Sequence, residues 1–534
     1  MSDTLAAQFS RTVETYPQRT FLRALRSSGE QRLTYRETAA WVARAVTNLQ
    51  GLGAGDCVVL YSGESASTSL FVLACAHLGV VSVPLSPSFS DAALESLVHR
   101  TSARAIFVPG DEPRAPSVKD AEGRPLRIIT DADLAAPAEP ADLRALAAAR
   151  RAEEPHVFLP TSGSTGEPKL VVRSAGSYDY DARVTSIGYL ASEEPPHRVL
   201  MTSTFAHTVG FFVLHSAVHL AAELCIPSEL DTATRLGEAQ RFDPTIIHVA
   251  PRTLRALYQQ HLQVDGGKGR LFGPSAQALN VGGAPVEVEL LRYLLDQGIQ
   301  PCEGYGASET GVLVKTPRGG WREGCAGKAT EGTELKLAED GELLSKSAAF
   351  MLGYLGDETM TRECQTEDGY YRTGDYASIS EDGYVRILGR KRDVFNTQEG
   401  SNVYPNRIET LLEALPAVGQ VVLVGDQRPF IGALVVLAAP PAGASAGPLG
   451  HLSRESAPEV YRSLEEAFAS INATLEPIER VRRFAVFSSA FDPAIHTALP
   501  SGKIKRDRKE LERRYAERIR EIYATPLEER EAAG

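Results

Sequence analysis

The residues best suited to chemistry lie in the segment TSGSTGEPK, at positions 161–169. Gly163 and Gly166 have no Cβ, so the backbone there can approach an anion closely. Hydroxyl groups and one lysine add donors to this loop. Only 11 of the 56 basic residues are lysines, so a lysine in this loop stands out. The pattern predicts a cradle for the phosphates of a nucleotide, with donors from Thr161, Ser162, Ser164, Thr165 and Lys169.

Two carboxylates and a second lysine occur in other glycine-containing segments. Glu309 lies in EGYGASETG and Asp375 in YRTGDYA, and we expect both in loops. Beside a phosphate loop, these carboxylates fit the need for an Mg²⁺ ligand and an acceptor for a diol. Lys503, in PSGKIKR, stands at the start of a charged helix expected over residues 503–523. It is either a catalytic cation or a basic helix cap.

Three histidines mark a further candidate region. His207 lies in FAHT, directly before the helical pattern VGFFVLHSAVHLAA, where its side chain could point into a cleft. His215 and His219 are four residues apart and could share one helix face. Because no third ligand is evident, we expect them to be structural or to line a pocket, not to bind a metal.

The elements that must position these residues alternate between strand and helix patterns. Strands are expected over residues 57–63, 103–109 and 245–251, with helices such as 66–79 between them. Such alternation predicts an α/β fold with mixed or parallel sheets and helical crossovers. The phosphate loop should join two strands, HVFLP and LVVRS. The segment 110–155, rich in Ala, Pro and charge, is expected to be a surface excursion.

The pattern changes near GRKRD, at residues 389–393. A hairpin strand is expected before it, and after it come a helix, NRIETLLEALPAV, and two strands, VGQVVLVG and FIGALVVLA. We therefore predict a large N-terminal domain over residues 1–388, a hinge over 389–393, and a small mobile α+β domain over 394–534. The small domain carries Lys503.

The composition limits the classes of partner that the protein can be expected to bind. The net charge is −12, whereas a nucleic-acid-binding protein usually carries a basic field, so nucleic acid is not expected as a partner. Any anionic substrate must be held by local donors. No uninterrupted run of about 18 apolar residues suggests a membrane span, and the N-terminal segment does not read as a signal peptide. The six scattered cysteines indicate reduced thiols in a cytoplasmic protein.

Taken with the phosphate loop, five further motifs make the chain similar to the adenylate-forming superfamily of acyl-CoA ligases, adenylation domains and luciferases. The motifs are VGGAPV, EGYGASETG, YRTGDYA, GRKRD and PSGKIKR, in that order. The resemblance implies that Tyr305 stacks on adenine and Glu309 binds Mg²⁺. It also implies that Asp375 and Arg390 hold the ribose, while Arg392 is the hinge position.

The same resemblance assigns the remaining roles. Lys503 and Glu309 become catalytic, and His207 becomes the residue that walls and gates the acyl pocket. The implied ATP-binding residues are Thr161, Ser162, Gly163, Ser164, Thr165, Gly166, Lys169, Gly282, Gly283, Ala284, Pro285, Glu303, Gly304, Tyr305, Gly306, Ala307, Ser308, Asp375 and Arg390.

The implied activity is ATP- and Mg²⁺-dependent activation of an aryl or fatty acid as its adenylate, followed by transfer to a thiol, with CoA as the first choice. The segments SNVYPNRIE and GDQRPFIGALVVL resemble fatty acyl-CoA synthetases. The loop NTQEGSNVYP departs from the usual Ser-Gly-Gly pattern near the thiol tunnel. Three alternatives therefore stay open: loading of a separate carrier protein, activation of nitrite for N–N bond formation with an arylamine, and a nucleotide-binding protein without catalysis.

Overall fold

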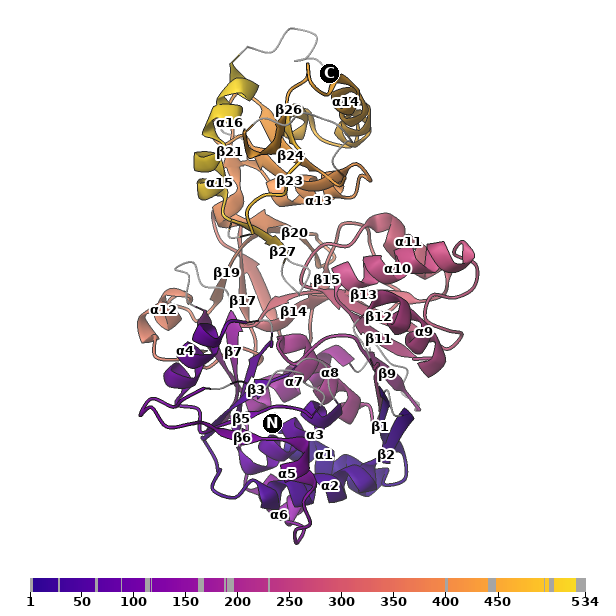
Figure 1. Cartoon of the computed structure of the whole chain (residues 1–534), viewed down its shortest axis with the longest axis vertical. Helices are drawn as coiled ribbons and strands as arrows, with labels where there is room; N and C mark the ends of the chain where they lie inside the picture. The colour runs from indigo at the N-terminus through magenta and orange to yellow at the C-terminus, as the bar shows by residue number, and fades with distance from the viewer. Residues whose placement is uncertain are drawn as a thin grey trace.

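The structure is a computed structural model. It describes residues 3–26, 29–62, 66–87, 89–110, 116, 118–161, 168–186, 189, 196–228, 231–398, 402–439, 448–493, 495–498 and 504–524. A large α/β part, built around two sheets, lies below a smaller α+β part near the C-terminus (Figure 1). The α/β prediction is therefore confirmed. No described helix is both long and apolar enough to cross a membrane.

Thirteen strands form one mixed sheet within the described residues. The neighbouring strands β13, β12, β11, β9, β10 and β1 are parallel, as the alternating pattern predicts, whereas the strands beyond β13 pair antiparallel. In spatial order the strands are β16 (Glu334–Leu337), β17 (Glu342–Lys346), β19 (Tyr371–Ile379), β20 (Tyr384–Arg390), β15 (Gly327–Ala329), β14 (Gly311–Lys315), β13 (Gln300–Ala307), β12 (Ala278–Gly282), β11 (Ile246–Val249), β9 (Arg198–Met201), β10 (Glu223–Ile226), β1 (Thr20–Arg26) and β2 (Gly29–Thr34).

A second sheet of the large part carries the phosphate loop. Its described strands, in spatial order, are β18 (Gly353–Tyr354), β8 (Lys169–Ser174), β7 (Pro155–Thr161), β4 (Val81–Leu85), β3 (Cys57–Tyr61), β5 (Ala105–Phe107) and β6 (Arg127–Ile129). β7 and β8 pair antiparallel, with Thr161 opposite Lys169. The loop thus joins two neighbouring strands, as its flanking sequences predict.

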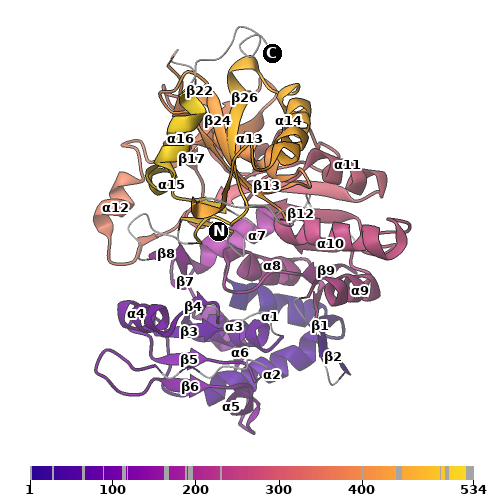
Figure 2. The ribbon, with the colours of Figure 1, turned by 45° about the horizontal axis from the view of Figure 1, so that its top comes forward.

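Three helices are buried along most of their length: α3 (Ala66–Leu78), α7 (Ala175–Ser186) and α8 (Thr208–His219). Two of them, α3 and α8, are apolar on almost every side, as expected of buried helices, whereas α7 also buries two aspartates. α7 contacts β8 of one sheet and β14 of the other, and it packs against α8. Figure 2 shows α3, α7 and α8 in the middle of the large part. The layer between the sheets is therefore where side chains from both sheets meet.

The other helices of the large part lie further from this layer. They are α1 (Leu5–Thr15), α2 (Tyr35–Asn48), α4 (Asp91–Thr101), α5 (Asp131–Ala135), α6 (Leu143–Ala148), α9 (Thr232–Phe242), α10 (Pro251–Asp265), α11 (Val288–Asp296) and α12 (Glu358–Glu363). α2 begins at a capping box, in which the Thr34 hydroxyl and the Glu37 carboxylate satisfy each other's backbone N–H groups.

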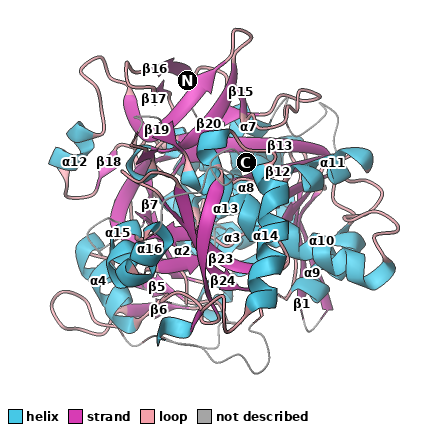
Figure 3. Ribbon diagram, turned by 90° about the horizontal axis from the view of Figure 1, so that it is seen from above, coloured by secondary structure: helices cyan, strands magenta, loops and turns pink. Residues whose placement is uncertain are grey.

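The smaller part follows a short 3₁₀ turn, η1 (Lys391–Asp393). Its main sheet runs β23 (Val418–Val424), β24 (Ile431–Leu437), β26 (Val481–Phe487) and β25 (His451–Leu452), with helices α13 (Pro405–Glu413), α14 (Pro458–Asn472), α15 (Arg508–Arg514) and α16 (Ala516–Tyr523). Two small ladders complete it: β21 (Phe395–Asn396) with β22 (Asn402–Val403), and β27 (His496–Ala498) with β28 (Ile504–Arg506). Viewed from above, this part covers the large one (Figure 3).

Three sequence-based expectations differ from the structure. The segment 110–155 is more than a surface excursion, because β6 joins the edge of the second sheet and Ile129 and Leu134 are buried. Asp375 lies within β19, not in a loop. The C-terminal segment is not one helix but β28 followed by α15 and α16. In each case long-range pairing or packing overrides the local pattern.

A buried ion network fixes β28 to α13. Glu409 on α13 is 0% exposed, and both of its oxygens accept hydrogen bonds from Arg508 at 2.8 Å. The guanidinium of Arg506 lies 3.3 Å from Glu409 and 2.8 Å from Glu413. These guanidiniums hold the pKa of Glu409 below its usual range, although burial acts in the opposite direction. The base of the β27–β28 hairpin is therefore anchored by charge.

We predict that Glu409→Ala destabilises the smaller part by about 3–5 kcal/mol, because it leaves two buried guanidiniums without their shared carboxylate. Urea unfolding followed by hydrogen exchange in β23 and β24 measures this change. Glu465→Ala removes the exposed ion pair with Arg454 and should cost less than about 1 kcal/mol. Equal losses in the two variants would contradict an anchoring role for Glu409.

Candidate active site

The predicted phosphate loop begins and ends on two neighbouring strands. Thr161 ends β7 and Lys169 begins β8, whereas Ser162, Gly163, Ser164, Thr165 and Gly166 lie outside the described residues. The ammonium of Lys169 lies 5.3 Å from the centre of the Tyr354 ring. The hydroxyl of Tyr354 donates to Oε1 of Glu309 at 3.0 Å. Tyr354 thus brings Lys169 and Glu309, far apart in sequence, to one place.

Glu309 stands on the turn between β13 and β14, and the backbone of that turn is held from several sides. Arg173 donates to the carbonyl of Ser308 at 3.1 Å, and the Met351 N–H donates to the carbonyl of Glu309 at 2.8 Å. Arg173 is itself 0% exposed and also donates to Ser177. These hydrogen bonds therefore fix the backbone that carries the Glu309 carboxylate.

In nucleotide sites, Mg²⁺ is usually bound by one or two carboxylates, and phosphates and water supply the remaining ligands. The Glu309 carboxylate fits this pattern. Among the described residues, no group of three or more His, Cys, Asp or Glu side chains could hold a metal on its own. Glu309 would therefore need phosphate oxygens to complete the coordination.

A second group of side chains gathers around Asp375, a buried carboxylate on β19. Tyr305 donates to its Oδ2 at 2.5 Å, and Nε of Arg390 lies 3.0 Å from its Oδ1. Asp375 and Arg390 face each other across β19 and β20. Burial and the nearby carboxylate raise the pKa of Tyr305, so its hydroxyl stays protonated. A carboxylate has about four acceptor positions, so its chemistry suits a diol.

The glycines predicted to face the nucleotide have steric reasons to be glycine. Gly283 has φ +88°, in the left-handed region, and a Cβ on Gly282 would lie 2.6 Å from the carbonyl oxygen of Gly304. A Cβ on Gly306 would lie 1.9 Å from the carbonyl oxygen of Gly311. The first approach brings β12 to β13 and the second brings β13 to β14, at the end where Tyr305 stands.

The remaining predicted residues are placed around these two groups. Gly282 ends β12, and Gly283, Ala284 and Pro285 follow before α11. Gly304, Gly306 and Ala307 lie on β13, and Ser308 on the next turn. Glu303 differs, because it accepts from the Trp321 indole at 2.8 Å, and burial raises its pKa to about 7. The Glu303 carboxylate is therefore bound to Trp321, unlike the other residues of this set.

The histidines separate into two roles. His207 is the N-cap residue of α8, as predicted, and burial lowers its pKa. Nε2 of His215 lies 3.4 Å from Nε2 of His156, and His219 lies 2.8 Å from Asp179. Burial also holds the pKa of His215 well below its usual range, so both rings of the His215–His156 pair are neutral at pH 7. His215 and His219 are therefore bound within the α7–α8 layer.

Lys503 lies outside the described residues, between β27 and β28. Figure 1 shows β27 on the side of the smaller part that faces the large one. Arg392, the predicted hinge residue, stands on η1 with its side chain 77% exposed. The hinge and the domain limits stay predictions.

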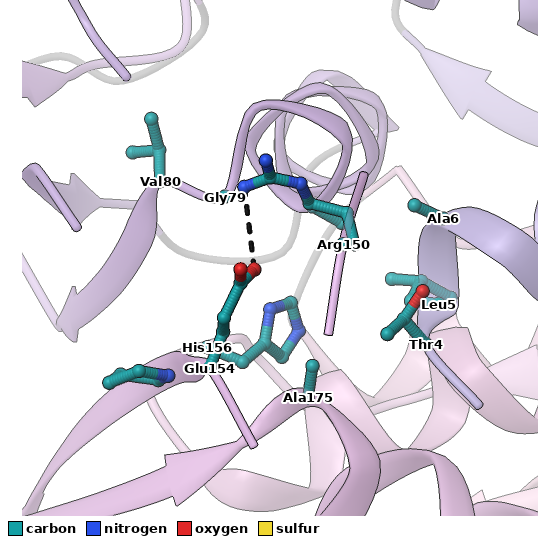
Figure 4. Close-up of a pocket in the computed structure, with 11 residues that line it drawn as sticks. Thr4, Leu5, Ala6, Gly79, Val80, Arg150, Glu154, His156 and Ala175 are labelled. Carbon is teal, nitrogen blue, oxygen red and sulfur yellow. Dashed lines mark ion pairs between the residues drawn. The ribbon is translucent and has the colours of Figure 1, made fainter. Parts of the chain in front are cut away.

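A small cavity elsewhere is not a substrate site. It has a volume of about 10 Å³, room for roughly one water molecule. Figure 4 shows Arg150 and Glu154, 3.4 Å apart, beside Gly79 and His156 in its wall. None of its lining residues belongs to the nucleotide motifs.

Comparison with known proteins decides the family. A family model described as AMP-binding enzyme matches residues 9–355, and one described as AMP-binding enzyme C-terminal domain matches residues 392–526. The chain belongs to the AMP-binding enzymes. It is therefore an ATP-dependent ligase of the adenylate-forming kind.

Individual relatives of this AMP-binding enzyme agree in length. It is 27% identical to long-chain-fatty-acid–CoA ligase FadD15 of Mycobacterium bovis, with 92% of each chain covered. It is 28% identical to feruloyl-CoA synthase of Amycolatopsis sp, over 76% of this chain and 82% of that one. A solved structure of o-succinylbenzoate CoA synthetase (MenE) from Bacillus subtilis with the acyl-adenylate OSB-AMP shares the fold, with a TM-score of 0.75, 20% identity, and coverage of 96% and 98%.

Sequence reasoning missed two residues that hold the candidate site together. Arg173 had one usable signal, since an arginine interrupts the apolar strand LVVRS and a buried charge needs partners. Tyr354 had no local signal, because its partners Lys169 and Glu309 come from distant segments.

We predict that Tyr354→Phe raises the Mg²⁺ concentration needed for half-maximal pyrophosphate release by about 10-fold or more. The change removes the hydroxyl that orients Glu309 but keeps the ring beneath Lys169, and outer partners of metal ligands typically contribute 10- to 100-fold. The KM for the acid should change little. Tyr370→Phe removes a similar but solvent-exposed bond, from Tyr370 to Glu334 at 2.7 Å, and should leave the Mg²⁺ dependence unchanged. A normal Mg²⁺ dependence in Tyr354→Phe would remove Tyr354 from the site.

Proposed function

We propose that this enzyme activates a carboxylic acid as its acyl-AMP and then transfers the acyl group to the thiol of CoA. The observation that carries the proposal is the meeting of two groups on β13 and the turn after it. Glu309, with Tyr354 and Lys169, suits the phosphates, and Tyr305, with Asp375 and Arg390, suits the nucleoside. An ATP bound across both would lie along one strand end.

In the first step, an oxygen of the acid bonds to the α-phosphorus of ATP, and pyrophosphate leaves as the bond to the bridging oxygen breaks. Mg²⁺, when bound by Glu309 and the phosphates, supplies charge that stabilises the leaving group. Lys169 adds charge from the end of the phosphate loop. Asp375 and Tyr305 hold the nucleoside, so much of the catalytic effect is positioning.

In the second step, the thiol sulfur bonds to the acyl carbon, AMP leaves, and the thiol proton is released. We propose that the smaller part turns at residues 389–393 between the steps. The names of the relatives, a long-chain fatty acid ligase and a feruloyl-CoA synthase, support a fatty or aryl acid and CoA as acceptor.

The function is tested by pyrophosphate release with a panel of aryl and fatty acids, followed by AMP formation with different acceptors. We expect pyrophosphate release with at least one carboxylic acid and AMP formation that increases with CoA. Increase only with a holo-carrier protein, or only with nitrite and an arylamine, would instead establish those alternatives. ATP binding without pyrophosphate release from any acid would indicate a nucleotide-binding protein without catalysis.

Lys503 provides a sharper prediction, on the proposal that its ammonium contacts both the acid oxygen and the α-phosphate. Lys503→Ala should reduce pyrophosphate release by about 10²–10³-fold or more, because a charge aimed at the transition state is lost. The same variant should convert a synthetic acyl-adenylate to the thioester at a nearly normal rate.

Lys505→Ala, two residues along on β28, is the matched control and should adenylate normally. If Lys505 proves essential and Lys503 does not, the wrong lysine has been assigned. If Lys503→Ala loses both half-reactions while folded, rotation of the smaller part is the idea to abandon.

A further inference from the structure

Polar side chains lie in register across the central strands of the mixed sheet. His248 on β11 is opposite Asn280 on β12, and Asn280 is opposite Cys302 on β13. Residues opposite each other on paired strands point to the same face. Lys315, on β14, lies opposite Gly304 and reaches the same layer, where it contacts α7 and α8. Four neighbouring strands thus direct polar groups into the layer between the sheets.

Lys315 is a buried cation with few partners. It is 1% exposed, and its ammonium donates to the carbonyl of Thr185 at 2.8 Å. The rings of Tyr189 and Phe212 lie 5.8 Å from it. Burial lowers the pKa of Lys315 to about 8, so it is still mostly protonated at neutral pH. An ammonium has three N–H donors, and one of them has a partner among the described residues.

Asp181, the carboxylate whose charge acts on Lys315, is already engaged. Its Oδ2 lies 3.7 Å from the guanidinium of Arg173, and its Oδ1 accepts from the Val312 N–H at 3.0 Å. Asp181 is thus the carboxylate paired with Arg173. Asp179, the other buried carboxylate of α7, is bound to His219, so among the described residues no carboxylate forms a direct ion pair with Lys315.

His248 contributes a second incomplete donor. Nδ1 of His248 lies 3.1 Å from the amide nitrogen of Asn280, which donates, so the ring proton is on Nε2. Nε2 is buried and has no hydrogen-bond partner in the part of the chain that the structure describes. Phe212 lies beside both groups, with its ring 5.5 Å from the imidazole. Lys315 and His248 therefore present unsatisfied donors around one aromatic ring.

The polar residues on β12 and β13 lie two positions before the glycines that are predicted to face the nucleotide. Asn280 and Cys302 each precede a glycine of the nucleotide turn, Gly282 and Gly304, by two residues, a distance of about 7 Å along a strand. Residues two apart share a face, and glycines leave that face without side chains. A Cβ on Gly304 would meet no atom closer than 3.7 Å, the Cγ1 of Val312. The face beside Gly304 thus has room for at least a methyl group.

We propose that Lys315 and His248 form the far end of the acid-binding site and select acids that carry a second oxygen acceptor, anionic or strongly polar, about one ring-length from the activated carboxyl. This inference rests on the proposed acid activation. The ammonium and the Nε2–H of His248 donate to that oxygen, and Phe212 packs against the body of the acid. An acid without the second oxygen leaves both donors unsatisfied, and such sites discriminate strongly against it.

The test compares matched acids: benzoate with 4-hydroxybenzoate, and hexanoate with adipate. In the unmodified enzyme, kcat/KM for pyrophosphate release should be at least about 10-fold higher for an oxygen-bearing acid than for its plain counterpart. The first pair tests a phenolic oxygen and the second a carboxylate. Lys315→Met, which keeps the length of the side chain, should lower kcat/KM for the preferred acid by about 10²-fold and change that of the plain acid by less than about 3-fold.

Lys328→Met is the matched control. Lys328 lies opposite Lys315 on β15, but its ammonium rests on the Tyr384 ring at 4.8 Å, so the preference should persist. If Lys315→Met does not fold, His248→Leu should reduce the same preference. The inference is wrong if the unmodified enzyme shows no preference, or if the folded variant keeps it.

A separate measurement distinguishes failure of this inference from failure of the proposed function. If no acid releases pyrophosphate, acid activation is wrong, and calorimetric binding of the same acids in the presence of AMP still decides the recognition role. Tighter binding of the oxygen-bearing acid to the unmodified protein than to Lys315→Met supports the site. Equal binding overturns it.

Discussion

The turn between β13 and β14 must keep one backbone conformation, because Tyr305 stands just before it and Glu309 stands on it. Its fixation comes from inside the protein. Arg173 and Met351 bind two successive carbonyls, and Gly306 and Gly311 approach too closely for any side chain. The nucleoside group and the phosphate group can act on one ligand only while this turn holds them in register.

That constraint accounts for the charge buried beneath the site. Arg173 lies in the layer between the sheets, where a lone cation is unfavourable, and Asp181 compensates for it. Asp181 in turn binds the Val312 N–H just past the turn, so the ion pair also fixes the start of β14. Stability and positioning are the same set of contacts here, since removing either charge would also release the backbone that carries Glu309.

Much of the fold follows from the sequence because its signals are local. The phosphate loop joins two strands because HVFLP and LVVRS are both apolar and β-branched, and the helical crossovers follow from periodicity. The expectations that failed concern residues whose structure depends on partners remote in sequence. Asp375 reads as a loop residue between Gly374 and Tyr376, yet pairing with β20 makes it part of a strand and places Arg390 opposite. No local pattern could indicate Tyr354, whose role depends on two partners from other segments.

The distribution of charge explains how an acidic chain can hold polyanions. With a net charge of −12, the overall field opposes ATP and a carboxylate alike. The cations near the candidate site, Lys169, Arg173, Lys315 and Arg390, instead act over a few ångströms, where burial weakens screening. Arg173 and Arg390 are each matched by a carboxylate, whereas the ammonium of Lys169 rests on an aromatic ring and that of Lys315 on a carbonyl. The unmatched cations are the lysines, so they are the ones whose charge is available to a ligand.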